Sequence, residues 1–154
     1  MALFLTTYYN KVDRKGRVSV PAAFRTALEK EGHDDIVVFP SFTSSALEGC
    51  SIDYIDDLAD RTAESYDPFS PEHDDLKTLI FSSCHRLAWD PEGRVALPEA
   101  ILQHAGITDQ AAFVGQGRNF QIWEPEAYKI HEAEARARAL VNRPPIPPRR
   151  SEGR

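Results

Sequence analysis

Hydrophobic and polar residues alternate in two short stretches of the chain, residues 17–20 (RVSV) and residues 94–97 (RVAL). This period of two predicts strands that turn their valines toward a core and their arginine toward solvent. Each stretch is followed by Pro21 or Pro98, and proline suits the first position of a helix because the N–H it lacks has no partner there. Helices should follow, each with a buried apolar stripe; the stripe residues are Phe24, Leu28, Ile101 and Ala105, and Gly106 is the expected terminator of the second helix.

The two stretches belong to an internal repeat. Residues 13–24 (DRKGRVSVPAAF) align with residues 90–101 (DPEGRVALPEAI) at an offset of 77 residues, and six of the twelve aligned positions are identical. After each copy, the pattern predicts a helix and two short strands. The expected strands are residues 36–39 and 50–52 after the first copy, and residues 112–114 and 120–123 after the second. Each copy is therefore predicted to fold as strand, turn, strand, helix, strand, strand.

Each copy opens with the pattern D-x-x-G-R, which is typical of a tight turn between strands. The aspartate can accept hydrogen bonds from backbone amides further along the turn, and the glycine supplies a positive φ angle. The turn residues of the two motifs are Asp13, Gly16 and Arg17 in the first copy, and Asp90, Gly93 and Arg94 in the second.

Longer helical patterns connect and follow the copies. Residues 52–61 have an amphipathic pattern with Ile55 and Leu58 on one stripe. Residues 73–81 are compatible with a second short helix, and residues 124–139 with a third.

With 154 residues, the chain has the size of one ordinary globular unit. A single copy with such short strands would bury too small a core to be stable alone, so we expect the copies to interleave their strands about a pseudo-twofold axis. The expected fold is mainly β with helices, of the α+β class, in which two tandem repeats form one barrel-like body with flanking amphipathic helices. The predicted segments are residues 3–66 (first repeat), 67–80 (connecting helix or linker), 81–140 (second repeat) and 141–154 (a flexible tail rich in proline and arginine).

Charge is unevenly distributed along the chain. The formal net charge is −6, which argues against nucleic-acid binding by the whole surface. The charge is +3 over residues 1–32, −10 over 33–79, −2 over 80–142 and +3 over 143–154. A basic segment followed by an acidic one suggests one surface for a polyanion and another that repels it, although ordinary solvated charge is the alternative. The chain has no signal-peptide pattern and no long apolar run, so a cytoplasmic protein without a membrane partner is expected.

The two D-x-x-G-R segments, each continuing as apolar, any residue, apolar, proline, resemble the bacterial MraZ family at this spacing and chain length. That family is similar in fold to the AbrB/SpoVT group of swapped-hairpin DNA-binding domains. The resemblance covers about residues 3–140 and excludes the tail. It implies AbrB-like swapped-hairpin repeats and a sequence-specific transcriptional regulator of the division and cell-wall gene cluster. It also implies association with the nucleoid and assembly into rings, commonly octamers.

The two turns share a pattern but not a charge. Residues 13–17 (DRKGR) carry +2 and residues 90–94 (DPEGR) carry −1, so only the first turn can approach phosphates without repulsion. Arg17 is the first candidate for a base-edge contact, because a guanidinium group can bind guanine O6 and N7 together. The structural alternative, for Arg17 as for Arg94, is an ion pair with the aspartate of its own turn. The other DNA-binding candidates are Lys11, Arg14 and Lys15 for phosphates, with Arg25 as a flanking residue.

One such turn would bind weakly at physiological salt, because each phosphate contact contributes only about −0.9 to the slope of log K against log salt concentration. Several identical turns held together can raise avidity by roughly 10² to 10⁴. The sequence therefore favours a homo-oligomer that binds repeated boxes in double-stranded DNA. The family resemblance implies that these boxes are direct repeats in promoter DNA and that the oligomer is an octameric ring. The acidic residues 33–79 would then face away from the duplex or meet basic groups of a neighbouring subunit, and both possibilities stay open.

Other groups of residues indicate structure rather than chemistry. The aspartates at 53, 56, 57 and 60 share one helical face, for which a solvated surface is favoured over a cation site. The five histidines and two cysteines lack the spacing of a zinc site, so neither a metal nor a cofactor is expected, and both cysteines are predicted in the core. Aromatic residues beside the strands could stack on bases, but the core is favoured for them: Phe4, Tyr8, Tyr9, Phe39, Phe42, Trp89 and Trp123.

Two other functions compete with transcriptional regulation. In the first, an oligomeric interaction protein docks an acidic protein partner on its basic loop. In the second, a small hydrolase uses Asp90 and Glu92. Only the proximity of these two carboxylates in the sequence supports a hydrolase. The sequence contains no nucleophile elbow, phosphate loop or HExxH motif, so the protein is predicted not to be an enzyme.

Overall fold

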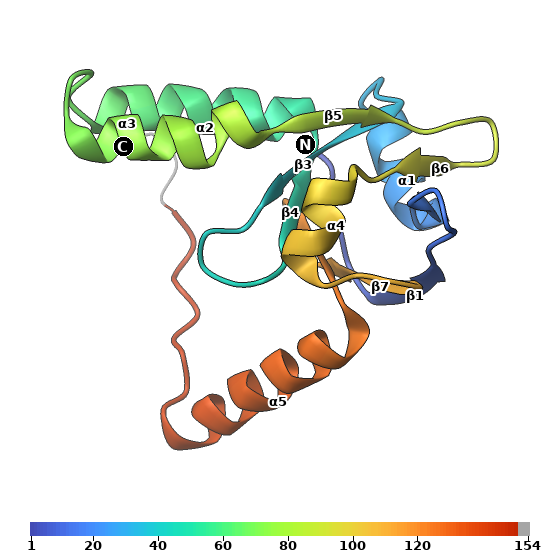
Figure 1. The fold of residues 1–154 in the computed structure, drawn as a ribbon. Coiled ribbons are helices and arrows are strands. Elements are labelled where there is room, and N and C mark those ends of the chain that lie inside the picture. Colours follow the sequence, from blue (N-terminus) through green and yellow to red (C-terminus); the bar gives the residue numbers. More distant parts are fainter. Residues whose placement is uncertain (151–154) are drawn as a thin grey trace.

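The computed structural model describes residues 1–150, which form an α+β fold built mainly on antiparallel strands (Figure 1). The elements in chain order are β1 (Thr7–Lys11), β2 (Arg17–Ser19), α1 (Ala22–Glu29), β3 (Asp35–Pro40), β4 (Leu47–Cys50), α2 (Ile52–Ser65), α3 (Pro71–Leu79), the 3₁₀ turn η1 (Phe81–Ser83), β5 (His85–Ala88), β6 (Arg94–Ala96), α4 (Glu99–Ala105), β7 (Gln110–Gly115), β8 (Phe120–Trp123) and α5 (Pro125–Val141). The predicted α+β class is confirmed.

The two copies of the repeat exchange strands. A six-stranded sheet has the order β1-β7-β8-β4-β3-β5, and β2 pairs with β6 in a separate two-stranded sheet. The first strand of each copy therefore pairs with the other copy, β1 with β7 and β5 with β3, all antiparallel. The predicted interleaving is confirmed, and within residues 1–150 the strands leave the larger sheet open instead of closing it into a barrel.

The strand registers define the expected pseudo-twofold axis. In the small sheet Val18 lies opposite Val95, its equivalent in the repeat. In the large sheet Glu48 lies opposite Gln121, and these are the second residues of the equivalent strands β4 and β8. A twofold axis passes midway between two equivalent residues that face each other, so the pseudo-twofold axis passes through both sheets.

The main core lies between the six-stranded sheet, the β2–β6 pair and the helices α1 and α4. Phe24 of α1 is at the centre, with the rings of Phe4, Tyr8, Phe113 and Phe120 at centroid distances of 5.1 to 6.4 Å. The alternation of β7 buries both faces of the sheet, because Ala111 and Phe113 face this core while Ala112 and Val114 join a second cluster under α5. The stripes predicted for α1 and α4 are buried as expected: Phe24, Leu28, Ile101 and Ala105.

Several predicted boundaries and burials are wrong. The strand expected at residues 50–52 ends at Cys50, because the Ser51 side chain accepts a hydrogen bond from the Tyr54 amide and starts α2. Pro21 and Pro98 precede their helices as N-cap residues instead of occupying the first helical position. The helix expected at residues 73–81 spans Pro71–Leu79, with Ser70 as its cap.

The burial predicted for the aromatic residues and cysteines is only partly correct. Phe39 and Trp123 are buried as predicted, whereas Tyr9 and Phe42 are exposed and Cys84 is only half-buried.

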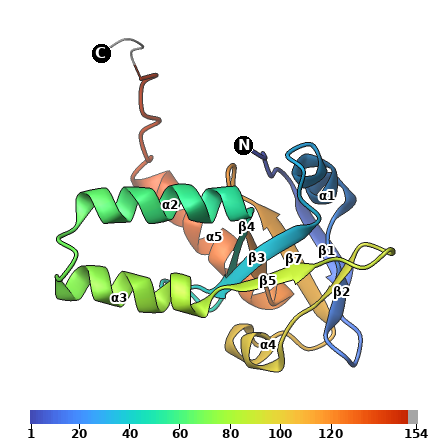
Figure 2. The same ribbon diagram turned by 90° about the horizontal axis from the view of Figure 1, so that it is seen from above.

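Two helical parts extend from the body. Figure 2 shows α2 and α3 side by side as a hairpin that projects away from the end where β2 lies. α5 covers the outer face of the sheet at its start, where Ala127 and Tyr128 pack on Trp123, and it has no buried residue along its length. Residues 143–150 continue without regular structure, and the last residues of the predicted tail, 151–154, lie outside the described part of the chain. Within residues 1–150, no helix combines the length and apolar character needed to cross a membrane.

Candidate nucleic-acid interface

The first turn, residues 13–17, is held by one carboxylate. Asp13 Oδ1 accepts hydrogen bonds from the backbone amides of Lys15 at 2.9 Å and Arg17 at 2.8 Å. Asp13 Oδ2 accepts a hydrogen bond from Arg17 Nε at 2.7 Å. The backbone closes the turn through Gly16 N to Asp13 O at 3.0 Å, with Gly16 at a φ of 77°. The predicted roles of the aspartate and the glycine are both confirmed.

These hydrogen bonds stabilise the charged form of Asp13. The bond from the Arg17 amide is the main cause that lowers the pKa of Asp13 below its ordinary value. Desolvation opposes it as the next largest effect, and the Arg17 side chain and the Lys15 amide then add to the lowering. The hydrogen bonds of the turn therefore favour the ionised carboxylate, which is the form that pairs with Arg17.

The second turn, residues 90–94, repeats this geometry. Asp90 Oδ1 accepts from the amides of Glu92 at 2.9 Å and Arg94 at 3.0 Å, and Oδ2 accepts from Arg94 Nε at 3.3 Å. The Arg94 amide is again the main cause of a lowered pKa at Asp90. One difference is electrostatic, because Arg94 Nη2 also pairs with Glu92 Oε2 at 3.3 Å, and the residue equivalent to Glu92 in the first turn is Lys15.

Each turn is fastened to the other copy. The Gly16 carbonyl accepts a hydrogen bond from the Leu97 amide at 2.9 Å, and the Gly93 carbonyl accepts one from the Val20 amide at 3.0 Å. A side chain at Gly16 has no room, since a Cβ there would lie 2.8 Å from the Leu97 carbonyl oxygen. The exchange of strands thus places the two turns at one end of the molecule and fixes their relative position.

The structure places Arg25 beside the second turn. Arg25 Nε donates to the Val20 carbonyl at 3.1 Å, and its guanidinium group lies directly over Gly93. The residue equivalent to Arg25 is Leu102, which lies over Gly16 in the same way. Arg25 therefore adds positive charge next to the acidic turn, and its role as a residue flanking the DNA contact stays a prediction.

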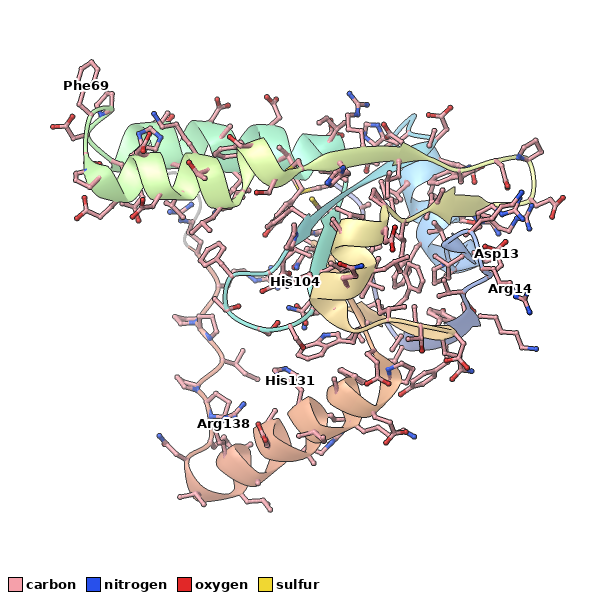
Figure 3. The ribbon with its side chains drawn as sticks, in the orientation of Figure 1. Asp13, Arg14, Phe69, His104, His131 and Arg138 are labelled. Carbon is pink, nitrogen blue, oxygen red and sulfur yellow. The ribbon has the colours of Figure 1, made fainter. Side chains whose placement is uncertain are left out.

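The other candidate cations lie together at the first turn. Arg14 and Lys15 are exposed in the turn itself, and Lys11 is exposed at the end of β1. Figure 3 shows Arg14 pointing away from the body, at the end of the molecule opposite Phe69. Arg17 forms the ion pair with Asp13 that the structural alternative foresaw, and its side chain remains 40% exposed. An open hollow of about 430 Å³ lies between this turn and α4, with Glu99 and Gln103 on its far side.

One positioning residue was missed by the sequence reasoning. Asn10 on β1 donates from its side-chain amide to the Ser19 carbonyl at 2.8 Å, which ties the two strands that carry the turn. Its counterpart in the second copy is Leu87, so the repeat alignment itself contains no signal for this contact.

The alternatives to a binding surface find no geometric support. The Asp90 carboxylate holds its own turn and Glu92 pairs with Arg94, so both carboxylates have structural partners within the turn. Within residues 1–150 no three histidine, cysteine or acidic side chains are grouped closely enough to hold a metal ion. The aspartates of α2 are exposed, as predicted, and Asp57 and Asp53 form surface pairs with Arg61 and His33.

The chain is similar to known proteins over most of its length. A family model described as "MraZ protein, putative antitoxin-like" matches residues 80–143. The transcriptional regulator MraZ of Pelagibacter ubique is 44% identical over 92% of this chain and 90% of its own length. Those of Rickettsia bellii and Rickettsia akari are 44% and 43% identical, over 93% and 85% of this chain and 95% and 87% of their own lengths. The relatives are named as regulators and not as enzymes, in line with the non-catalytic prediction. With this identity over nearly its whole length, the chain belongs to the MraZ family.

Proposed function

We propose that this chain is a DNA-binding transcriptional regulator and that its first turn, residues 13–17, makes the principal contact with the duplex. The relatives named as transcriptional regulators support the function. The assignment of the site to the first turn rests on the difference in charge between two turns of the same geometry. The first presents Arg14 and Lys15 to solvent, where the second has Pro91 and Glu92.

In the proposed contact, the cations of the first turn have different roles. Arg14, Lys15 and Lys11 bind phosphate oxygens, which position the turn on the duplex without reading its sequence. Arg17 reads a base edge. A guanidinium group has five N–H donors, and the bond from Nε to Asp13 uses one of them. The donors on the two terminal nitrogens are those that bind guanine O6 and N7, while Asp13 fixes the plane of the group.

In this proposal the protein works as a homo-oligomer in the cytoplasm, associated with the nucleoid. A few phosphate contacts per copy give weak binding at physiological salt, so several copies in a closed ring, of the octameric form, are needed to bind direct repeats tightly. The genes under control are those of the division and cell-wall cluster, including the gene of the protein itself.

Footprinting on the DNA upstream of its own gene, at a series of salt concentrations, tests this function. Regularly spaced protected boxes, lost as salt rises, are the expected result. A scrambled duplex of the same composition is the control. Equal and weak protection of both duplexes would instead favour the alternative in which the basic turn docks an acidic protein.

A further inference from the structure

The tip of the α2–α3 hairpin presents an aromatic side chain to solvent. Phe69 is 96% exposed, although the turn that carries it is well structured. Asp67 Oδ1 accepts a hydrogen bond from the Phe69 amide at 3.0 Å, the Ser70 amide donates to the Asp67 carbonyl at 3.0 Å, and the rings of Tyr66 and His73 stack just below at 5.9 Å. A rigid turn that holds an exposed ring is preorganised for docking, because little conformational entropy is lost on binding.

The hairpin that carries Phe69 is strongly acidic. Residues 52–79 contain nine carboxylates and two basic side chains. This charge excludes DNA as the surface on which Phe69 docks, since the phosphates would be repelled. A partner for the tip must combine an apolar recess with positive charge.

The end of α5 has both properties. An open groove of about 750 Å³ lies between the last turns of α5 and the chain that follows, lined by Ala135, Ala139, Val141 and Pro144, with Arg138 at its side. Val141, which lines the groove, is 91% exposed, and its neighbour Leu140 is 90% exposed. Residues 135–150 contain five arginines and no acidic residue, so the groove lies in basic surroundings.

The tip of a chain lies far from the groove of the same chain. α2 extends about 21 Å from the sheet at 1.5 Å per residue over its fourteen residues. In Figure 3, Phe69 and Arg138 lie at separate corners of the molecule, and Asp13 lies at the opposite side from both. Contact between tip and groove therefore needs two copies, and it leaves the residue 13–17 turn of each copy free.

We propose that the Phe69 tip of one copy docks into the α5 groove of the next copy. This inference rests on the proposed homo-oligomer and names the contact that builds it. The two surfaces differ, so the interface is heterologous, and repetition of the same contact generates a ring when the rotation closes. The acidic middle segment then meets basic groups of a neighbouring subunit, which is one of the two placements that the sequence leaves open.

Cysteine cross-linking of the full chain tests the contact. Pro68→Cys keeps Phe69 in place, and Ala139→Cys lies in the groove; both sites are at the surface. The double variant under mild oxidation is expected to give a ladder of linked copies on a non-reducing gel, while each single variant gives unlinked chains. The unmodified protein, with Cys50 buried and Cys84 half-buried, is the background control. A dimer from Pro68→Cys alone would show a tip-to-tip contact, and the absence of a ladder would also overturn the inference.

Mass measurement separates this inference from the proposed function. Phe69→Ser is expected to raise the concentration at which the oligomer dissociates by about tenfold or more, as for other buried aromatic anchors. Leu79→Ser, a partly exposed apolar residue of the same hairpin, is the matched control and should leave that concentration unchanged. If the unmodified protein is itself a monomer in light scattering, the proposed assembly fails and the inference with it. If it is an oligomer that Phe69→Ser leaves intact, only the inference fails.

Discussion

At the scale of single residues, Asp13 determines the shape of the surface proposed to bind DNA. Its two carboxylate oxygens accept three hydrogen bonds, two from the backbone amides of Lys15 and Arg17 and one from the Arg17 side chain. The sequence already indicated this arrangement, because the D-x-x-G-R pattern is local and its chemistry is contained in five residues. The position of Arg25 was not predictable in the same way, because its contact with Gly93 crosses from one copy of the repeat to the other.

The lowered pKa of Asp13 predicts how the turn responds to acid. A lowered pKa in the folded state means that this carboxylate stabilises the turn fully above its ordinary value of 3.8 and loses that effect as the pH falls through the lower folded value. In an NMR titration, the amide signals of Lys15 and Arg17 should therefore shift with a midpoint below 3.8. Asp13→Asn should abolish the shift. A midpoint at or above 3.8 would contradict the hydrogen bonding described for the turn.

Gly16 should be the least replaceable residue of the turn. In Gly16→Ala, the alanine must adopt a positive φ, and its Cβ would lie 2.8 Å from the Leu97 carbonyl oxygen. Gly32→Ala is the matched control, with a φ of 81° and no atom within 4 Å of the new Cβ. Both variants carry the backbone strain of about 1–2 kcal/mol, and crowding should destabilise Gly16→Ala by about 1–3 kcal/mol more. Urea unfolding measures the difference. Equal losses of unfolding free energy in the two variants would show that the contact with Leu97 is relieved without destabilising the fold.

At the scale of elements, the order of strands and helices could be predicted, whereas several of their ends could not. The internal repeat, together with the strand period of two and the helical apolar stripe, was sufficient to predict the order β, β, α, β, β in both copies. The boundary after Cys50 was misplaced because Ile52 continues an apolar pattern that suits a strand, while the deciding signal is the hydroxyl of Ser51 as a helix cap. Tyr9 and Phe42 were expected in the core because they adjoin strands, but an aromatic residue on the outer face or in a loop has the same sequence context.

The cap at Ser51 yields a prediction for α2. Ser51→Ala removes the acceptor of the Tyr54 amide and should lower the free energy of unfolding by about 0.5–2 kcal/mol. Ser65→Ala, at the exposed last residue of α2, is the control and should have a much smaller effect. Thermal or urea unfolding followed by circular dichroism provides the comparison. Equal stability of the two variants would mean that the helix starts without help from this hydroxyl.

At the scale of the whole molecule, the exchange of strands has a functional consequence. Because β1 and β5 pair with the opposite copies, the two turns lie at one end and are fixed to each other through Gly16 and Gly93. The need for two small copies to share a core was sufficient to predict this interleaving. The exposed groove at α5 was not predictable, because the helical pattern of residues 124–139 does not show which of its faces the sheet covers.

The most direct test of the account uses the second turn as a template for the first. Arg14→Pro combined with Lys15→Glu converts residues 13–17 into the sequence of residues 90–94, which folds in the same geometry in the same molecule. Fluorescence anisotropy with a duplex that carries the protected boxes should then show binding reduced by at least about a hundredfold at physiological salt, and a smaller slope of log K against log salt concentration, with the oligomer mass unchanged. Unaltered affinity and slope in this variant would contradict the assignment of DNA binding to the first turn.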